Sequence, residues 1–291
     1  MTDELSSLDP QQLIPIGIYM LVLLTGGLIL TTRFISRLKA EPSLLTPRLT
    51  RWRISLIESL IFGCAVVAVY SMAISVVGQL QSTITAIWPD TPAAMDVFGT
   101  FTMEVMLILT VLGLYKYFGE EEKGRISPHP LPLFQAFNIG ALSMVAAYPV
   151  LFGVNLAWSW LLELLISLGV NIQIQAQPAV TMIMEMNSPV LLALLIFAAV
   201  VMAPIAEELV FRAGLYRMCR DRLPTSVSVI ITSLLFALVH FHWQGIPGLF
   251  LVGVSLALIY EFTGDIKASM AFHMAFNLNS VIMMFLVPHV A

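Results

Sequence analysis

The sequence predicts an all-α, polytopic integral membrane helix bundle with about eight transmembrane helices. One observation is the composition: 58% of the 291 residues are hydrophobic, 11% are charged, and the mean hydropathy is +0.90. Soluble domains carry about 25% charged residues, so the chain is not expected to form a water-soluble globule. The other observation is a series of apolar runs, most of them close to the roughly twenty residues that cross a bilayer.

Three apolar runs occupy the first part of the chain, at 13–32, 54–80 and 97–117. The residues before the first run contain no Lys or Arg, so we expect no cleavable signal peptide there and the run stays in the protein. The loop 33–53 contains six Lys or Arg residues and one Glu. A short loop this basic is cytoplasmic by the positive-inside rule, which places the N-terminus outside.

Five more spans are expected in the second part. The segment 133–170 is too long for one straight span, and Pro149 should kink it because proline removes a helical hydrogen bond. After a polar outer stretch at 171–187, a fifth span begins near Ser188 and ends in a basic, cytoplasmic stretch at 217–222. The last three spans are expected at 224–241, 248–262 and 269–287. Eight crossings would place both termini outside.

The chain is expected to form one structural unit with two parts. Residues 1–132 provide three spans without a diagnostic motif, and residues 133–291 form the core that carries the polar motifs. A formal net charge of −4 leaves no basic face to neutralise phosphates, so nucleic acid is not an expected partner. Two cysteines, Cys64 and Cys219, are too few for a disulfide framework or a zinc knuckle. The expected location is the plasma or inner membrane of the cell, with the lipid bilayer as a partner.

The most informative stretch is 204–212, which follows an apolar run and contains Glu207, Glu208 and Arg212. A charge at the centre of a bilayer costs roughly 2.5–3.5 kcal/mol, so such residues are usually paired, turned to the bundle interior and functional. Glu208 precedes Arg212 by four residues and shares its helix face, whereas Glu207 points about 100° away. We interpret Glu208 and Arg212 as a pair that fixes the helix, and Glu207 as the group available for chemistry.

Two further polar pairs lie in the last spans. Phe236 precedes His240 by four residues, and His273 precedes Asn277 by four, a spacing that places each pair on one helix face. His273 and Asn277 could therefore point two hydrogen-bond donors at one spot, while Phe236 covers the face on which His240 stands. Each pair alone is more often a structural contact between helices. Together they favour function, because a membrane core tolerates few unexplained polar groups.

Other polar residues in or near the apolar runs are given no role. The glutamates Glu58, Glu104 and Glu163 are interpreted as helix-end or interhelical partners. His242 lies two residues after His240, so it should face elsewhere, near a loop.

The three motifs, in this order on successive membrane helices, resemble those of the CPBP family of intramembrane proteases (Abi family), which includes the Rce1-like CAAX prenyl proteases. The shared features are a double Glu with an Arg four residues after the second, a Phe four before a His, and a His four before an Asn. The segments 203–206 and 258–264 are also similar to that family. The resemblance covers about 133–288, and three motifs in order are more specific than any one of them.

The resemblance implies a glutamate-type endopeptidase that cleaves a peptide or protein substrate at the membrane, including CAAX-like peptides, without a cofactor. It implies that Glu207 and His240 activate a water molecule, and that His273 and Asn277 stabilise the oxyanion of the tetrahedral intermediate. It also implies structural roles for the neighbouring residues Glu208, Arg212 and Phe236.

Two alternatives remain open from the sequence. Glu207, His240 and His273 could hold a zinc ion as three protein ligands with water in the fourth position, as catalytic zinc sites do. The chain would then be a zinc-dependent membrane metalloprotease, although it has no His-Glu-x-x-His pair on one helix. A non-proteolytic role, as an immunity or scaffold protein that binds a partner in the membrane, is the second alternative.

Overall fold

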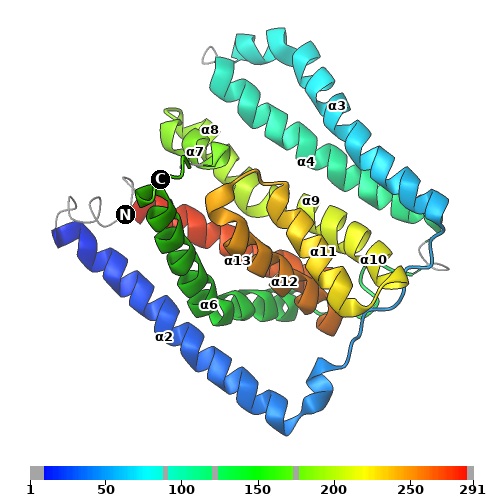
Figure 1. The fold of residues 1–291 in the computed structure, drawn as a ribbon. Helices are drawn as coiled ribbons and strands as arrows, with labels where there is room; N and C mark the ends of the chain where they lie inside the picture. The colour runs from blue at the N-terminus through cyan, green and yellow to red at the C-terminus, as the bar shows by residue number, and fades with distance from the viewer. Residues whose placement is uncertain (1–9, 88–90, 120–123, 173–176, 287–291) are drawn as a thin grey trace.

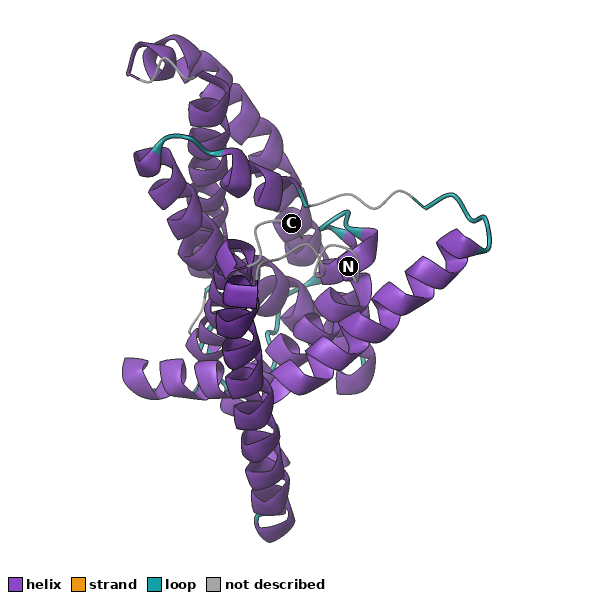
Figure 2. Ribbon diagram, turned by 90° about the vertical axis from the view of Figure 1, so that its left-hand side faces the viewer, coloured by secondary structure: helices purple, strands orange, loops and turns teal. Residues whose placement is uncertain are grey.

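The computed structural model describes residues 10–87, 91–119, 124–172 and 177–286, which form helices and loops with no strand among them (Figures 1 and 2). In this part of the chain, seven helices are long and apolar enough to cross a membrane. An eighth apolar helix has only 14 residues. The predicted all-α polytopic fold with about eight membrane segments is confirmed.

The first part of the chain forms three long helices and one short turn of helix: α2 (Pro10–Ala40), η1 (Pro42–Leu45), α3 (Leu56–Ile87) and α4 (Thr91–Phe118). Each long helix extends beyond the apolar run that predicted it, because helical hydrogen bonding continues into polar residues outside the lipid. Ser55 and Glu58 form a capping box at the start of α3, with Ser55 N donating to Glu58 Oε2 over 2.7 Å and Glu58 N to Ser55 Oγ over 3.2 Å. The interpretation of Glu58 as a helix-end residue is confirmed.

The next helix, α6 (Leu133–Ser167), is continuous through Pro149 and bends along its length, as Figure 1 shows. Helix α2 packs against the bend, where a Cβ on Gly27 would lie 2.6 Å from Pro149 Cδ. Thr31 Oγ1 donates to the Ala146 carbonyl over 2.7 Å, close to the proline. This hydrogen bond ties α2 to α6 next to Val145, whose carbonyl loses its helical donor to the proline.

The acidic motif lies in one helical stretch with changing geometry. After the short helix α7 (Pro178–Glu185), the stretch consists of α8 (Pro189–Phe197), the π-helix η2 (Ala198–Met202), α9 (Ala203–Glu208), the π-helix η3 (Leu209–Tyr216) and α10 (Arg217–Arg222). Ser188 caps α8 by accepting a hydrogen bond from Leu191 N over 3.5 Å. π-Helical turns are frequent at functional sites, and here they flank both glutamates. Helix α7 lies within 171–187, so the predicted polar outer stretch is partly helical.

The last elements are α11 (Thr225–Leu238), η4 (Trp243–Gly245), α12 (Ile246–Thr263) and α13 (Ile266–Leu286). Helix α12 ends at Gly264, whose φ of 68° is left-handed and suits glycine. Helix α13 packs against α6 at Gly140, where a Cβ would overlap the Ala268 carbonyl oxygen. Fourteen residues rise about 21 Å, less than the roughly 30 Å of hydrocarbon, so α11 is too short to span the membrane alone.

The first and last spans meet on one side of the bundle. Ile16 and Met20 of α2 pack against Met283 of α13, and the Tyr19 hydroxyl donates to Asn279 Oδ1 over 2.8 Å. The start of α2 and the end of α13 therefore lie on the same side of the bundle (Figure 1).

The opposite ends of the helices are tied together by buried charged residues that the sequence patterns did not single out. Arg217, 1% exposed, donates to the Arg125 carbonyl over 2.6 Å. Glu261, fully buried, pairs with Arg220 at 3.0 Å and accepts from the Tyr216 hydroxyl at 2.8 Å. These contacts join α10 to α12 and to the loop before α6, and they hold the helices that carry the polar motifs in one arrangement.

Candidate active site

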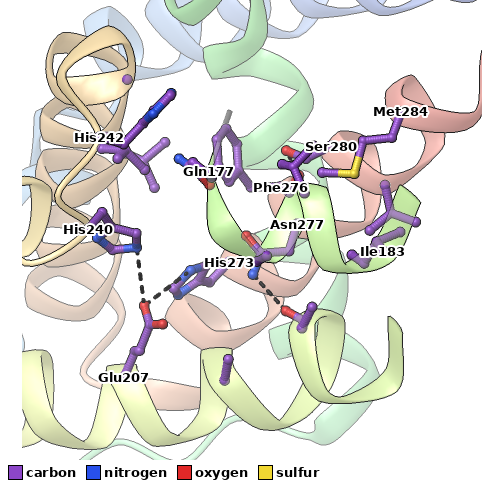
Figure 3. A pocket seen from close by; sticks show the side chains of 18 of the residues that line it. Gln177, Ile183, Glu207, His240, His242, His273, Phe276, Asn277, Ser280 and Met284 are labelled. Carbon is purple, nitrogen blue, oxygen red and sulfur yellow. Dashed lines mark hydrogen bonds and ion pairs between the residues drawn. The ribbon is translucent and has the colours of Figure 1, made fainter. Parts of the chain in front are cut away.

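A cavity of about 490 Å³ lies among α4, α7, α9, α11, α12 and α13. The four residues that the sequence singled out for chemistry all line it: Glu207, His240, His273 and Asn277 (Figure 3). Side chains from two helices and from the turn after a third are thus brought to one place.

Glu207 is the centre of this group. Its Oε2 lies 3.9 Å from His240 Nε2 and 3.7 Å from His273 Nε2. Both separations are longer than a hydrogen bond, and Oε2 is buried without a hydrogen-bond partner among the described residues. Polar groups at this separation are within reach of one bridging water molecule.

His240 lies in the turn that follows α11, and the turn sets the orientation of its ring. His240 Nδ1 is 2.7 Å from the Phe236 carbonyl oxygen. A carbonyl only accepts, so Nδ1 donates and, in the neutral ring, Nε2 presents its lone pair to Glu207. The following residue, Phe241, has a φ of 48°, an uncommon left-handed conformation that turns the chain sharply. The Phe236 ring packs against His240 with centroids 4.8 Å apart, which confirms the predicted contact.

His273 is held from behind by Glu208. Its Nδ1 donates to Glu208 Oε1 over 3.1 Å, which turns Nε2 towards Glu207. Glu208 is fully buried and also accepts from the Ser269 hydroxyl over 2.5 Å. Sequence reasoning missed both contacts. Ser269 could have been noticed, because it precedes His273 by four residues and shares its helix face.

The predicted pair of Glu208 and Arg212 is confirmed, with 3.4 Å between Glu208 Oε2 and Arg212 Nε. Arg212 is 1% exposed and does not line the cavity. Its Nη2 donates to the Gly253 carbonyl over 3.1 Å, and its guanidinium lies 4.6 Å from the centre of the Phe236 ring. The pair therefore links the acidic motif to α12 and to the aromatic ring beneath His240.

Asn277 makes a contact that the sequence interpretation did not foresee. Its Nδ2 donates to the Ala199 carbonyl over 2.7 Å, in the π-helix η2. His273 Nε2 faces Glu207, so the two side chains have different partners in this geometry. A primary amide carries two N–H groups, so one donor of Asn277 remains for another partner in the cavity.

Residues 189–279 match the model of a family described as type II CAAX prenyl endopeptidase Rce1-like. This segment is Rce1-like. The match confirms the family resemblance and contains all three polar motifs, although it is shorter than the expected 133–288. No curated protein and no solved structure matches the chain. At the family level, the match together with the apolar helices supports a multi-pass membrane peptidase.

Two residues that line the cavity were interpreted differently from the sequence. His242 lines the cavity instead of facing away from it, and burial, followed by the neighbouring His240, lowers the pKa of His242. Glu104 of α4 also lines the cavity, and its Oε2 has no hydrogen-bond partner in the described part of the chain, where it pairs with no other helix. Glu163 is exposed near the end of α6, as expected of a helix-end residue.

Glu207 and His273 meet although they lie at different distances from the basic ends of their helices. At about 1.5 Å per residue, Glu207 is about 15 Å from Arg217, and His273 is about 9 Å from Lys267. Their side chains nevertheless approach within 3.7 Å. The helices therefore begin at different levels or lean against one another, and residue counts from a common membrane surface do not predict which side chains meet.

Proposed function

We propose that the chain is a membrane-embedded endopeptidase in which Glu207 and His240 activate a water molecule. The substrates would be CAAX-like or other membrane-associated peptides, and the enzyme would act in the plasma or inner membrane. The observation that carries this proposal is Glu207 Oε2, which is buried without a hydrogen-bond partner and faces two imidazole nitrogens across 3.7 and 3.9 Å.

The orientation of His240 suits the binding of water. With Nδ1 donating to the Phe236 carbonyl, Nε2 of the neutral ring accepts a hydrogen bond, as Glu207 Oε2 does. A water molecule that donates to both acceptors directs its lone pairs away from them, towards a substrate carbonyl carbon. Glu207 would take a proton as the water oxygen attacks, and the proton would then pass to the departing amine nitrogen.

The oxyanion formed in this step requires donors. Asn277 has one N–H beyond the one that Ala199 accepts. His273 Nδ1 already donates to Glu208, so Nε2 is the ring nitrogen left to contact the oxyanion in the cavity. In this proposal Glu208, Arg212 and Phe236 position the catalytic side chains without touching the substrate.

Replacing Asn277 with alanine is expected to lower kcat by about 10²–10³-fold with a smaller effect on KM, because an oxyanion donor acts mainly in the transition state. The matched control is Ser280→Ala, since Ser280 lines the same cavity but donates to the Phe276 carbonyl of its own helix. Steady-state kinetics and thermal unfolding should be measured together. A loss of activity that follows a loss of stability would show that the bond to Ala199 matters instead.

The zinc-dependent alternative has a direct test. Among the described residues, no three His, Cys, Asp or Glu side chains form a group that could hold a metal ion. We therefore expect purified, active protein to contain far less than one zinc per chain and to keep its activity after chelator dialysis. Stoichiometric zinc, whose removal stops turnover and whose return restores it, would favour the metalloprotease.

The choice between an enzyme and a scaffold is tested in cells. Membrane peptides from cells with the wild-type chain should be compared by mass spectrometry with those from cells with Glu207→Gln. We expect cleavage products that are present only with the wild type. If both chains support the cells equally and the peptides are the same, the function is a non-proteolytic immunity or scaffold role.

A further inference from the structure

Glu104 is a carboxylate in the middle of a membrane helix. Helix α4 runs from Thr91 to Phe118, so about 20 Å of helix separates Glu104 from either end. Glu104 is 6% exposed, and its Oε2 is buried without a hydrogen-bond partner among the described residues. Ionisable groups at this depth are rare and usually functional, because the lipid interior penalises them.

The cavity supplies no fixed positive charge to Glu104. Its lining contains two carboxylates, Glu104 and Glu207, which interact unfavourably, and no Lys or Arg. The buried Arg212 is already paired with Glu208. Among the histidines of the lining, His240 and His273 face Glu207.

The cavity that Glu104 lines also has apolar walls, which suit an aliphatic chain that ends in a cation. Thr100 lies one helical turn before Glu104 and also lines the cavity; its hydroxyl donates to the Asp96 carbonyl, so the oxygen is left to accept. Ile183 and Leu195 line the cavity and belong to a core cluster that includes residues of α4. The subsite therefore combines a carboxyl group with apolar walls.

We infer that Glu104 is a recognition subsite for a lysine or arginine side chain of the substrate. A buried carboxyl group is stabilised as an anion by a partner that brings both positive charge and N–H donors. This inference rests on the proposed function in that the cavity receives a peptide. It also assigns part of the specificity to α4, outside the Rce1-like segment 189–279.

The test measures binding without turnover. Full-length Glu207→Gln protein in detergent micelles is dialysed against three mixtures of hydrophobic pentapeptides, and the retained peptides are quantified by mass spectrometry. The first mixture has a central lysine and blocked ends, and the second has norleucine in place of the lysine. The third has norleucine and a free amino terminus. Because the protein is already inactive, an absence of proteolysis in the wild type would refute the proposed function without affecting this measurement.

We expect the lysine mixture to bind at least about tenfold more tightly than the other two, as for a charge-assisted hydrogen bond. Adding Glu104→Gln should abolish this preference, whereas the matched control Glu163→Gln should keep it. The thermal midpoint of the Glu104→Gln protein should not fall, because no partner is lost. A preference that survives Glu104→Gln, a preference for the free amino terminus, equal binding of all mixtures, or a lowered midpoint would each overturn the inference.

Discussion

Replacing Glu207 with glutamine is expected to lower kcat by about a thousandfold or more, within the range that a positioned general base contributes. Glutamine has nearly the same shape and can still hold a water molecule, but it cannot accept a proton from it. Glu207 Oε2 has no hydrogen-bond partner among the described residues, so little stabilising contact is lost. The thermal midpoint in detergent should therefore stay close to that of the wild type.

The measurement is peptide cleavage by purified wild-type and variant protein, with thermal unfolding recorded on the same samples. Glu163→Gln is the matched control, because it makes the same change on an exposed face of α6, away from the cavity. Substantial cleavage by the Glu207→Gln protein would refute its role as the base. A large fall in its thermal midpoint would show that Glu207 also has a structural role.

Replacing Glu208 with glutamine should instead destabilise the protein, by about 3–5 kcal/mol in the free energy of unfolding. Glu208 is fully buried and contacts three groups: Arg212 Nε at 3.4 Å, His273 Nδ1 at 3.1 Å and the Ser269 hydroxyl at 2.5 Å. Glutamine can accept one of these hydrogen bonds but cannot compensate the positive charge of Arg212. Removing one partner of a buried ion pair leaves the other charge buried and uncompensated.

Denaturation in mixed micelles would measure this loss, with Glu163→Gln again as the control. The double variant Glu208→Met, Arg212→Met should lose less stability than Glu208→Gln, because removing both charges leaves neither one uncompensated. The division of roles between the two glutamates would be wrong if Glu207→Gln and Glu208→Gln lowered stability equally.

The structure follows the sequence interpretation most closely where a contact depends on one helix. Glu208 and Arg212 meet because four residues make nearly one helical turn, a spacing that can be read directly from the chain. The Phe236 and His240 rings meet for the same reason, although α11 ends at Leu238 and His240 lies in the turn beyond it. Helix ends were less predictable, because apolar runs report the lipid boundary and not the last helical hydrogen bond.

Contacts between helices were harder to foresee. Glu208 bonds to His273 and Ser269, and Asn277 bonds to Ala199, through packing that brings distant segments together. Glu104 seemed to be an ordinary interhelical partner because its own helix gives no sign of the cavity. Only the positions of α4, α9 and α13 place its carboxylate in the same cavity as Glu207.

The order of amino acids alone determines that this protein is a polytopic helix bundle and singles out the residues for which we propose its chemistry. It does so because the hydrophobic effect and helical periodicity act over short stretches of chain. The packing of the helices decides how those residues are used: which histidine nitrogen faces Glu207, which glutamate is tied into the core, and that α4 contributes a further carboxylate. Those outcomes depend on the relative depth and tilt of separate helices, which no local pattern encodes.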